Sequence, residues 1–126
     1  MNIAITSTGN HLEAQVDPRF GRCQYFVIVD PETMEWEAID NENAQLGGGS
    51  GIQAGQLMAQ KDVKAVLTGH CGPNAFQTLS AAGIKIFTGI DGTVQEAIEQ
   101  YKSGQLTSTE SSTVPSHFGL NQGKRR

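Results

Sequence analysis

The sequence has few of the residues that build metal-bound or disulfide frameworks. It contains two cysteines, Cys23 and Cys71, and no CxxC, HxH or HExxH spacing. We therefore expect free thiols in a reducing compartment and no closed structural zinc site. No apolar run approaches the roughly 20 residues that a membrane helix requires, and no basic segment precedes an apolar one as in a signal peptide. These absences predict a cytoplasmic protein without a membrane partner.

The signatures of nucleic-acid and nucleotide binding are also missing. The formal net charge is −4 and the pI about 5.2, with no basic stripe, so we expect no nucleic-acid partner. The glycine-rich stretches lack the lysine of a P-loop, and no GxGxxG follows the first expected strand. The expected strands NIAIT, VKAVL and IKIF contain no carboxylates, which argues against two-metal nuclease chemistry.

Hydrophobic periodicity predicts one α/β domain within the 126 residues. Strands are expected at 2–6, 25–29, 34–39, 63–67 and 84–87, and helices at 50–61, at 73–82 and from a cap at Asp91 or Thr93 to a stop at Gly104. The second and third strands are expected to form a hairpin, and the later alternation of helices and strands implies parallel strands. We predict a five-stranded mixed sheet between helical layers in residues 1–104, followed by a flexible Ser/Thr/Gln/Gly-rich tail at 105–126.

Three loops are expected to meet at the carboxyl edge of the parallel strands, where such sheets bind ligands. They are 7–10, 68–73 and 88–92, and the glycine-rich stretch 47–51 leads into a further helix. Helix N-termini with nearby glycines suit an anion, although a flexible connector is an equal alternative for 47–51. The candidate cofactor-binding residues are Thr8, Gly9, Asn10, His11, Arg19, Arg22, Cys23, Gly47, Gly48, Gly49, Ser50, Gly51, Gly69, His70, Cys71, Gly72, Asn74, Thr88 and Gly89.

His70 and Cys71 are adjacent in the turn after the expected strand 63–67. Neighbours in an extended chain point to opposite faces, so both ligate one metal only if the turn bends sharply. A free cysteine is often a small buried hydrophobe, and a single soft ligand beside a cluster-sized cofactor is the alternative.

Cys23 is close to Arg19 and Arg22 in the stretch RFGRC. Nearby arginines favour a thiolate and also attract anions. The alternative is that both arginines pair with surface carboxylates such as Asp17. The candidate metal ligands are His70, Cys71 and Cys23.

Three stretches carry a family resemblance: RFGRCQYFVIVD, NENAQLGGGSG and TGHCGPNAFQTLSAAGIKIF. Over residues 2 to about 101 the sequence resembles the dinitrogenase iron–molybdenum cofactor biosynthesis family, which includes the NifX and NafY carriers, the carboxyl-terminal part of NifB and stand-alone members of the orange-protein type. The resemblance implies a ribonuclease H-like three-layer α/β/α fold without nuclease residues. It also implies binding or carriage of an anionic metal–sulfur cluster, either an iron–molybdenum cofactor precursor or a molybdenum–copper sulfide, with cofactor-assembly proteins as partners.

Three functions remain open at this point. The first is a non-enzymatic cluster carrier. The second is a phosphate- or nucleotide-binding enzyme that uses the same helix N-termini, and the third is a metal-free regulatory module whose tail recruits a partner. Nucleophilic catalysis is not favoured, because the sequence suggests no base and orienting acid around Cys71 or Cys23.

Overall fold

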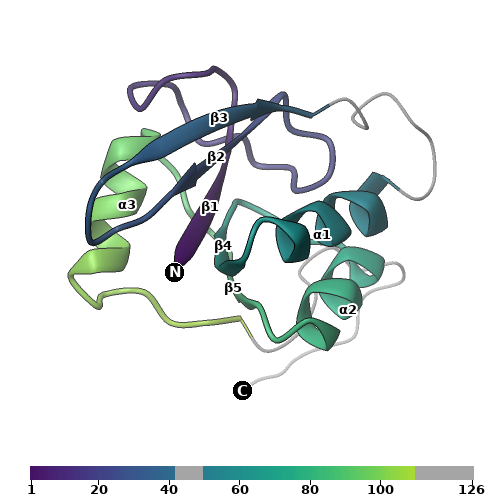
Figure 1. The fold of residues 1–126 in the computed structure, drawn as a ribbon. Helices are drawn as coiled ribbons and strands as arrows, with labels where there is room; N and C mark the ends of the chain where they lie inside the picture. Colours follow the sequence, from purple (N-terminus) through teal and green to yellow (C-terminus); the bar gives the residue numbers. More distant parts are fainter. Residues whose placement is uncertain (42–49, 110–126) are drawn as a thin grey trace.

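The structure is a computed structural model that describes residues 1–41 and 50–109. Its elements are β1 (Asn2–Ser7), β2 (Tyr25–Val29), β3 (Trp36–Asp40), α1 (Ser50–Gln60), β4 (Val63–Leu67), α2 (Pro73–Ala81), β5 (Lys85–Phe87) and α3 (Val94–Lys102) (Figure 1). The sheet has the order β3-β2-β1-β4-β5, in which β1, β4 and β5 are parallel and the β2–β3 hairpin is antiparallel. The predicted five-stranded mixed α/β fold is confirmed.

The sheet separates two hydrophobic clusters, because successive side chains of a strand point to opposite faces. Val66 of β4 belongs to the cluster that includes Met58 of α1 and Leu79 of α2. Its neighbour Leu67 belongs to the cluster that includes Ile98 of α3. Helices α1 and α2 therefore cover one face and α3 covers the other (Figure 1), an arrangement compatible with the ribonuclease H-like layering implied by the resemblance.

The third strand begins two residues later than the predicted start at Met34. Met34 has a φ of 62°, which lies outside the extended region, and its N–H donates to the Asp30 carbonyl at 2.7 Å. The Asp30 N–H in turn donates to the Glu35 carbonyl at 2.9 Å. The turn between β2 and β3 therefore extends through Glu35, and β3 starts at Trp36.

The chain continues to contact the sheet beyond the boundary predicted at Gly104. Leu106 packs against the cluster on the α3 side, and the Thr109 N–H donates to the Ile86 carbonyl of β5 at 2.6 Å. Residues 105–109 are thus attached to the domain, whereas the rest of the predicted tail lies outside the described residues. Within the described ranges, none of the helices is both long enough and apolar enough to cross a membrane.

Candidate functional site

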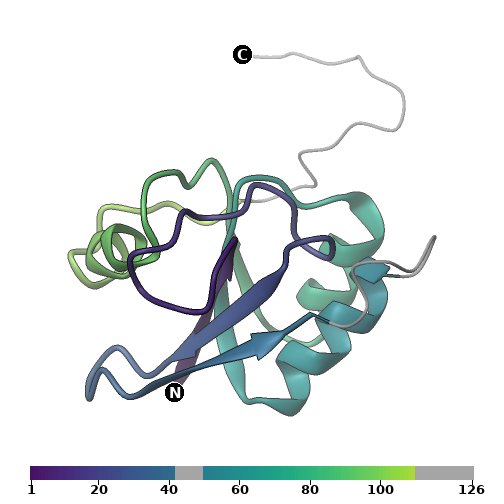
Figure 2. The same cartoon turned by 90° about the horizontal axis from the view of Figure 1, so that it is seen from above.

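The long segment after β1 crosses the carboxyl edge of the parallel strands, from the side of α3 to the side of α1 and α2 (Figure 2). Near α3, the Val16 N–H donates to the Gly92 carbonyl at 2.9 Å. Towards α2, the Phe20 N–H donates to the His70 carbonyl at 3.2 Å. The segment therefore occupies the strand edge where a crevice was expected, and it divides the predicted site residues into two groups.

One group lies beside α3, whose N-terminus is already satisfied. The Thr93 hydroxyl accepts from the Glu96 N–H at 3.1 Å, and the Glu96 carboxylate accepts from the Thr93 N–H at 2.9 Å. The N–H groups of Val94 and Gln95 donate to backbone carbonyls of the segment after β1. The expectation that the loop 88–92 leads to an anion-binding helix N-terminus is therefore wrong, and Thr93 is the cap.

The other residues predicted on this side are engaged in local structure. The Gly9 N–H donates to the Ser7 hydroxyl at 3.1 Å. His11 lies in the same loop and is exposed. The Thr88 hydroxyl lies 2.6 Å from that of Thr109, and the Gly89 N–H donates to the Gly69 carbonyl at 2.9 Å. The loop 7–11 and the Thr88–Gly89 turn are thus braced by the domain itself. Thr8 and Asn10 are exposed in the same loop.

The second group lies where α1 and α2 begin side by side. A Cβ atom at Gly51 of α1 would lie 3.0 Å from the Cβ of Ala75 in α2, and one at Gly55 would lie 2.7 Å from Thr78. The helices therefore run in the same direction with adjacent N-termini, and neither has an acidic residue in its first turn. No described side chain caps α2 at Gly72, and a Cβ there would meet nothing within 4 Å. The first turn of α2 therefore presents partial positive charge to open space.

Arg19 and His70 are held next to this pair of helix ends by a backbone bridge. The His70 N–H donates to the Pro18 carbonyl at 2.7 Å, and the His70 carbonyl accepts from Phe20. Gly69 permits the close approach, because a Cβ there would lie 2.6 Å from the Pro18 Cα. Both the Arg19 and the His70 side chains are exposed. Two further predicted residues are also exposed, Arg22 in the turn after Phe20 and Asn74 at the start of α2.

Both cysteines lie in the hydrophobic core rather than at this surface. Cys23 and Cys71 have no exposed surface and belong to the cluster on the α1 and α2 side. Burial raises the pKa of each thiol to about 12, and the Asp17 carboxylate contributes to the shift of Cys23. Both are protonated at neutral pH, so neither is poised as a thiolate ligand. As expected for neighbours in an extended chain, His70 points outward and Cys71 inward.

The sequence predicted Asp17 as a surface carboxylate that pairs with a nearby arginine. Its Oδ1 accepts from the Arg19 N–H at 3.0 Å and pairs with the Arg19 Nε at 3.4 Å. The predicted ion pair with an arginine is present, but Asp17 is only 2% exposed. An Asp that precedes a proline and bonds the N–H two residues on is typical of an Asx turn, and that pattern could have revealed the contact.

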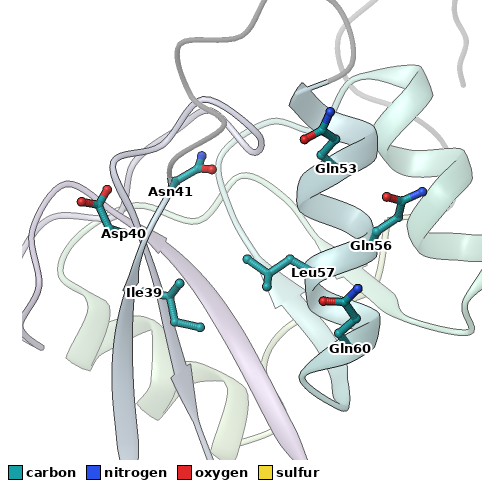
Figure 3. Close-up of a pocket in the computed structure, with 7 residues that line it drawn as sticks. All are labelled: Ile39, Asp40, Asn41, Gln53, Gln56, Leu57 and Gln60. Carbon is teal, nitrogen blue, oxygen red and sulfur yellow. The ribbon is translucent and has the colours of Figure 1, made fainter.

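A separate pocket of about 390 Å³ lies between β3 and α1 (Figure 3). It is lined by Ile39, Asp40, Asn41, Gln53, Gln56, Leu57 and Gln60. None of these residues was predicted to bind a ligand, although the glutamines recur on one face of α1. The Asn41 amide donates to the carbonyls of Gly21 and Cys23 at 3.1 and 2.9 Å, so the pocket rim is tied to the turn that carries Arg22.

The remaining predictions concern the glycine-rich loop and metal ligands. Gly47, Gly48 and Gly49 lie outside the described residues, whereas Ser50 and Gly51 form the start of α1. Across residues 1–41 and 50–109, no group of three or more His, Cys, Asp or Glu side chains could hold a metal ion. The strands β1, β4 and β5 carry no carboxylates, so a nuclease metal pair has no support there.

Comparisons with known proteins identify the family. The family model for the dinitrogenase iron–molybdenum cofactor matches residues 1–104. An uncharacterized protein of Methanocaldococcus jannaschii is 30% identical over 113 residues, which cover 87% of this chain and 92% of that protein. The apo form of the orange protein from Desulfovibrio gigas is 41% identical with a TM-score of 0.87, over 90% of this chain and 96% of that one. A candidate NifB protein from Thermotoga is 37% identical with a TM-score of 0.78, over 90% and 97% of the two chains. This chain therefore belongs to the dinitrogenase iron–molybdenum cofactor family.

Proposed function

We propose that the protein is a non-enzymatic carrier that binds an anionic metal–sulfur cluster where α1 and α2 begin. The binding surface, which we call the N-terminal surface, consists of Gly51, Gly72, Asn74, Arg19, Arg22 and His70. The carrying observation is the pair of adjacent helix N-termini without first-turn acids, next to the exposed Arg19 and His70 side chains. Each helix N-terminus acts as about half a positive charge. The arrangement therefore favours binding of an anion even though no buried cation among the described residues contributes.

The chemistry of the surface favours a cluster that is assembled before it binds. Cys23 and Cys71 are buried, protonated thiols, and an iron–sulfur cluster built on the protein would need thiolate ligands. Backbone N–H groups, a guanidinium and an imidazole can instead hold the sulfide surface of a completed cluster through charge-assisted hydrogen bonds. Among the described residues of this surface, His70 is the side chain that could coordinate a metal atom of the cluster.

The family and the orange-protein neighbour support the choice of cargo. We propose an iron–molybdenum cofactor precursor or a molybdenum–copper sulfide cluster, received from or delivered to cofactor-assembly proteins in the cytoplasm. A phosphate- or nucleotide-binding enzyme remains the competing hypothesis, because helix N-termini also suit phosphate. It predicts that nucleotides raise the melting temperature through ligand linkage.

Anaerobic equilibrium dialysis against tetrathiomolybdate, with and without copper(I), tests the proposal. Molybdenum retained on the protein is measured by elemental analysis, and the charge-transfer absorption is recorded. We expect saturable retention that Arg19→Ala and His70→Ala both weaken. His11→Ala is the matched control, because His11 is also an exposed histidine but lies in the loop next to α3. No retention by the wild-type protein, displacement by common nucleotides, or an equal loss in His11→Ala would overturn the proposal.

A further inference from the structure

Asp17 places a nearly buried carboxylate directly behind Arg19. The Asp17 Oδ1 accepts from the Arg19 N–H at 3.0 Å and pairs with the Arg19 Nε at 3.4 Å. The side chain of Asp17 is only 3% exposed, whereas that of Arg19 is 61% exposed. Burying a carboxylate is costly unless hydrogen bonds and opposite charge compensate it, and Arg19 supplies both.

The backbone of Asp17 is fixed to the end of the sheet. Its N–H donates to the Thr6 carbonyl at 2.9 Å, and its carbonyl lies 2.6 Å from the Thr6 hydroxyl. That hydroxyl also lies 2.8 Å from the hydroxyl of Thr68, the first residue after β4. Thr6 and Thr68 are both buried. The position of the Asp17 carboxylate is therefore set by β1 and by the loop that leads to α2.

The carboxylate engages one edge of the Arg19 guanidinium and leaves the rest of it exposed. A guanidinium has five N–H donors, and Asp17 contacts the Nε side. Among the described residues no second partner of the Arg19 side chain is present. The backbone hydrogen bonds of Pro18 and Phe20 to His70, on either side of Arg19, hold the Arg19 backbone beside that of His70.

We infer that Asp17 is a positioning residue of the anion site, an inference that rests on the proposed function. Asp17 holds the Arg19 guanidinium next to His70 so that its terminal N–H groups face the bound anion. The anchored carboxylate limits the rotamers of a long side chain, and less conformational entropy is then lost when the anion binds.

The direction in which removal of the Asp17 carboxylate changes anion affinity distinguishes a positioning role from a purely electrostatic one. A carboxylate near an anion repels it, so a purely electrostatic role predicts that removing Asp17 tightens anion binding. A positioning role predicts the opposite, because the guanidinium loses its fixed orientation. The same substitution therefore weakens binding under one account and strengthens it under the other.

A double-mutant cycle with the full chain and tetrathiomolybdate as the probe tests the inference. We expect Asp17→Ala to weaken binding by about five- to tenfold, the size of the conformational entropy that one long side chain loses when it is immobilised. Asp17→Asn should weaken binding less, because its amide oxygen can still accept from Arg19. In an Arg19→Ala background, Asp17→Ala should no longer weaken binding, because the residue that it positions is gone.

A second readout does not depend on the anion. In the wild-type protein the Arg19 Nε–H should exchange slowly enough to give an NMR signal, and Asp17→Ala should remove or shift that signal. Circular dichroism of each variant checks that the fold is kept, and Asp17→Asn serves if Asp17→Ala fails to fold. Tighter binding by both Asp17 variants, or an unchanged Nε–H signal in Asp17→Asn and Asp17→Ala, would overturn the inference alone. Absence of binding by the wild-type protein would instead overturn the proposed function.

Discussion

Gly55 of α1 lies directly against Thr78 of α2. A Cβ atom at Gly55 would lie 2.7 Å from the Thr78 Cγ2 and 3.2 Å from its Cβ. A glycine inside a helix is less favourable than alanine by about 1 kcal/mol. Gly55 therefore lowers the intrinsic stability of α1 but allows α1 and α2 to pack closely. The same close packing places Gly51 against Ala75 and the two helix N-termini side by side.

The first prediction follows from this contact. Gly55→Ala should lower the free energy of unfolding by about 1 kcal/mol or more, because overpacking outweighs the gain in helix propensity. Urea denaturation followed by circular dichroism measures the change.

Thr78→Ser provides the background that isolates the clash. Serine lacks the Cγ2 atom but keeps the hydroxyl that donates to the Asn74 carbonyl at 3.0 Å. In this background Gly55→Ala should destabilise the protein less than it does in the wild-type background, because only the 3.2 Å approach to the Cβ of residue 78 remains. If Gly55→Ala stabilises the otherwise wild-type protein, α1 and α2 do not pack as described.

The elements were predictable from the sequence because their signals are local. The continuous apolar run in YFVIV and the Gly83 that follows α2 act over a few residues, and the parallel direction of the later strands follows from right-handed connections. Which helix N-terminus is open could not be predicted in the same way. Gly72 and Thr93 both precede helices, but the N–H groups of α3 are taken by residues 12–14, which are far away in sequence.

The burial of the candidate site residues could not be predicted from the local sequence pattern either. A thiol next to an arginine suggested a thiolate, whereas the packing of the sheet against α1 and α2 decides that Cys23 is protonated. The depth of Asp17 depends on its bonds to Thr6 at the end of β1. Such tertiary contacts are absent from a single stretch of sequence.

The second prediction concerns Gly72, the N-cap of α2. Its backbone is extended, with φ −72° and ψ 171°, and a Cβ there would meet nothing within 4 Å. Gly72→Asp should keep the stability or raise it by a few tenths of a kcal/mol through capping. The same carboxylate should weaken tetrathiomolybdate binding by about tenfold or more, because it occupies and neutralises the helix end. Calorimetry and anaerobic dialysis measure the two effects.

Gly72→Asn is the matched control, since asparagine also caps but carries no charge. It should weaken anion binding less than Gly72→Asp does. Wild-type affinity in Gly72→Asp would place the anion away from the α2 N-terminus, even if the protein still binds molybdenum.

The third prediction concerns the pH dependence of stability. The pKa of Cys23 and of Cys71 is raised from 9.0 to about 12 by burial. Above pH 9 the unfolded chain loses these protons and the folded chain keeps them, so the stability from the neutral thiols is complete below pH 9 and is lost as pH rises towards 12. The wild-type free energy of unfolding, minus that of Cys23→Ala/Cys71→Ala, should fall by about 1.4 kcal/mol per pH unit for each thiol within this window. A difference that stays constant from pH 8 to pH 11 would show that the thiols are not buried.

The last prediction tests where the domain ends. Thr109 is bound to β5 and to the residue after it: its N–H donates to the Ile86 carbonyl at 2.6 Å, and its hydroxyl accepts from the Thr88 N–H at 3.2 Å and lies 2.6 Å from the Thr88 hydroxyl. A chain that ends at Gly104 loses these contacts of Thr109 and the packing of Leu106. It should be less stable than a chain that ends at Thr109, because it lacks these hydrogen bonds and the contact of the half-buried Leu106 side chain with the cluster on the α3 side.

Thr109→Val in the full chain separates the hydroxyl from the rest of the segment. Valine keeps the shape and the N–H but leaves the Thr88 N–H without its acceptor, so we expect a loss of about 1 kcal/mol. Hydrogen exchange at the Thr88 amide should become faster, while exchange in β1, on the far side of β4, should change only as much as the global stability does. Equal unfolding free energies for the chains that end at Gly104 and Thr109 would instead restore the boundary predicted from the sequence, with residues 105–109 contributing nothing to the domain.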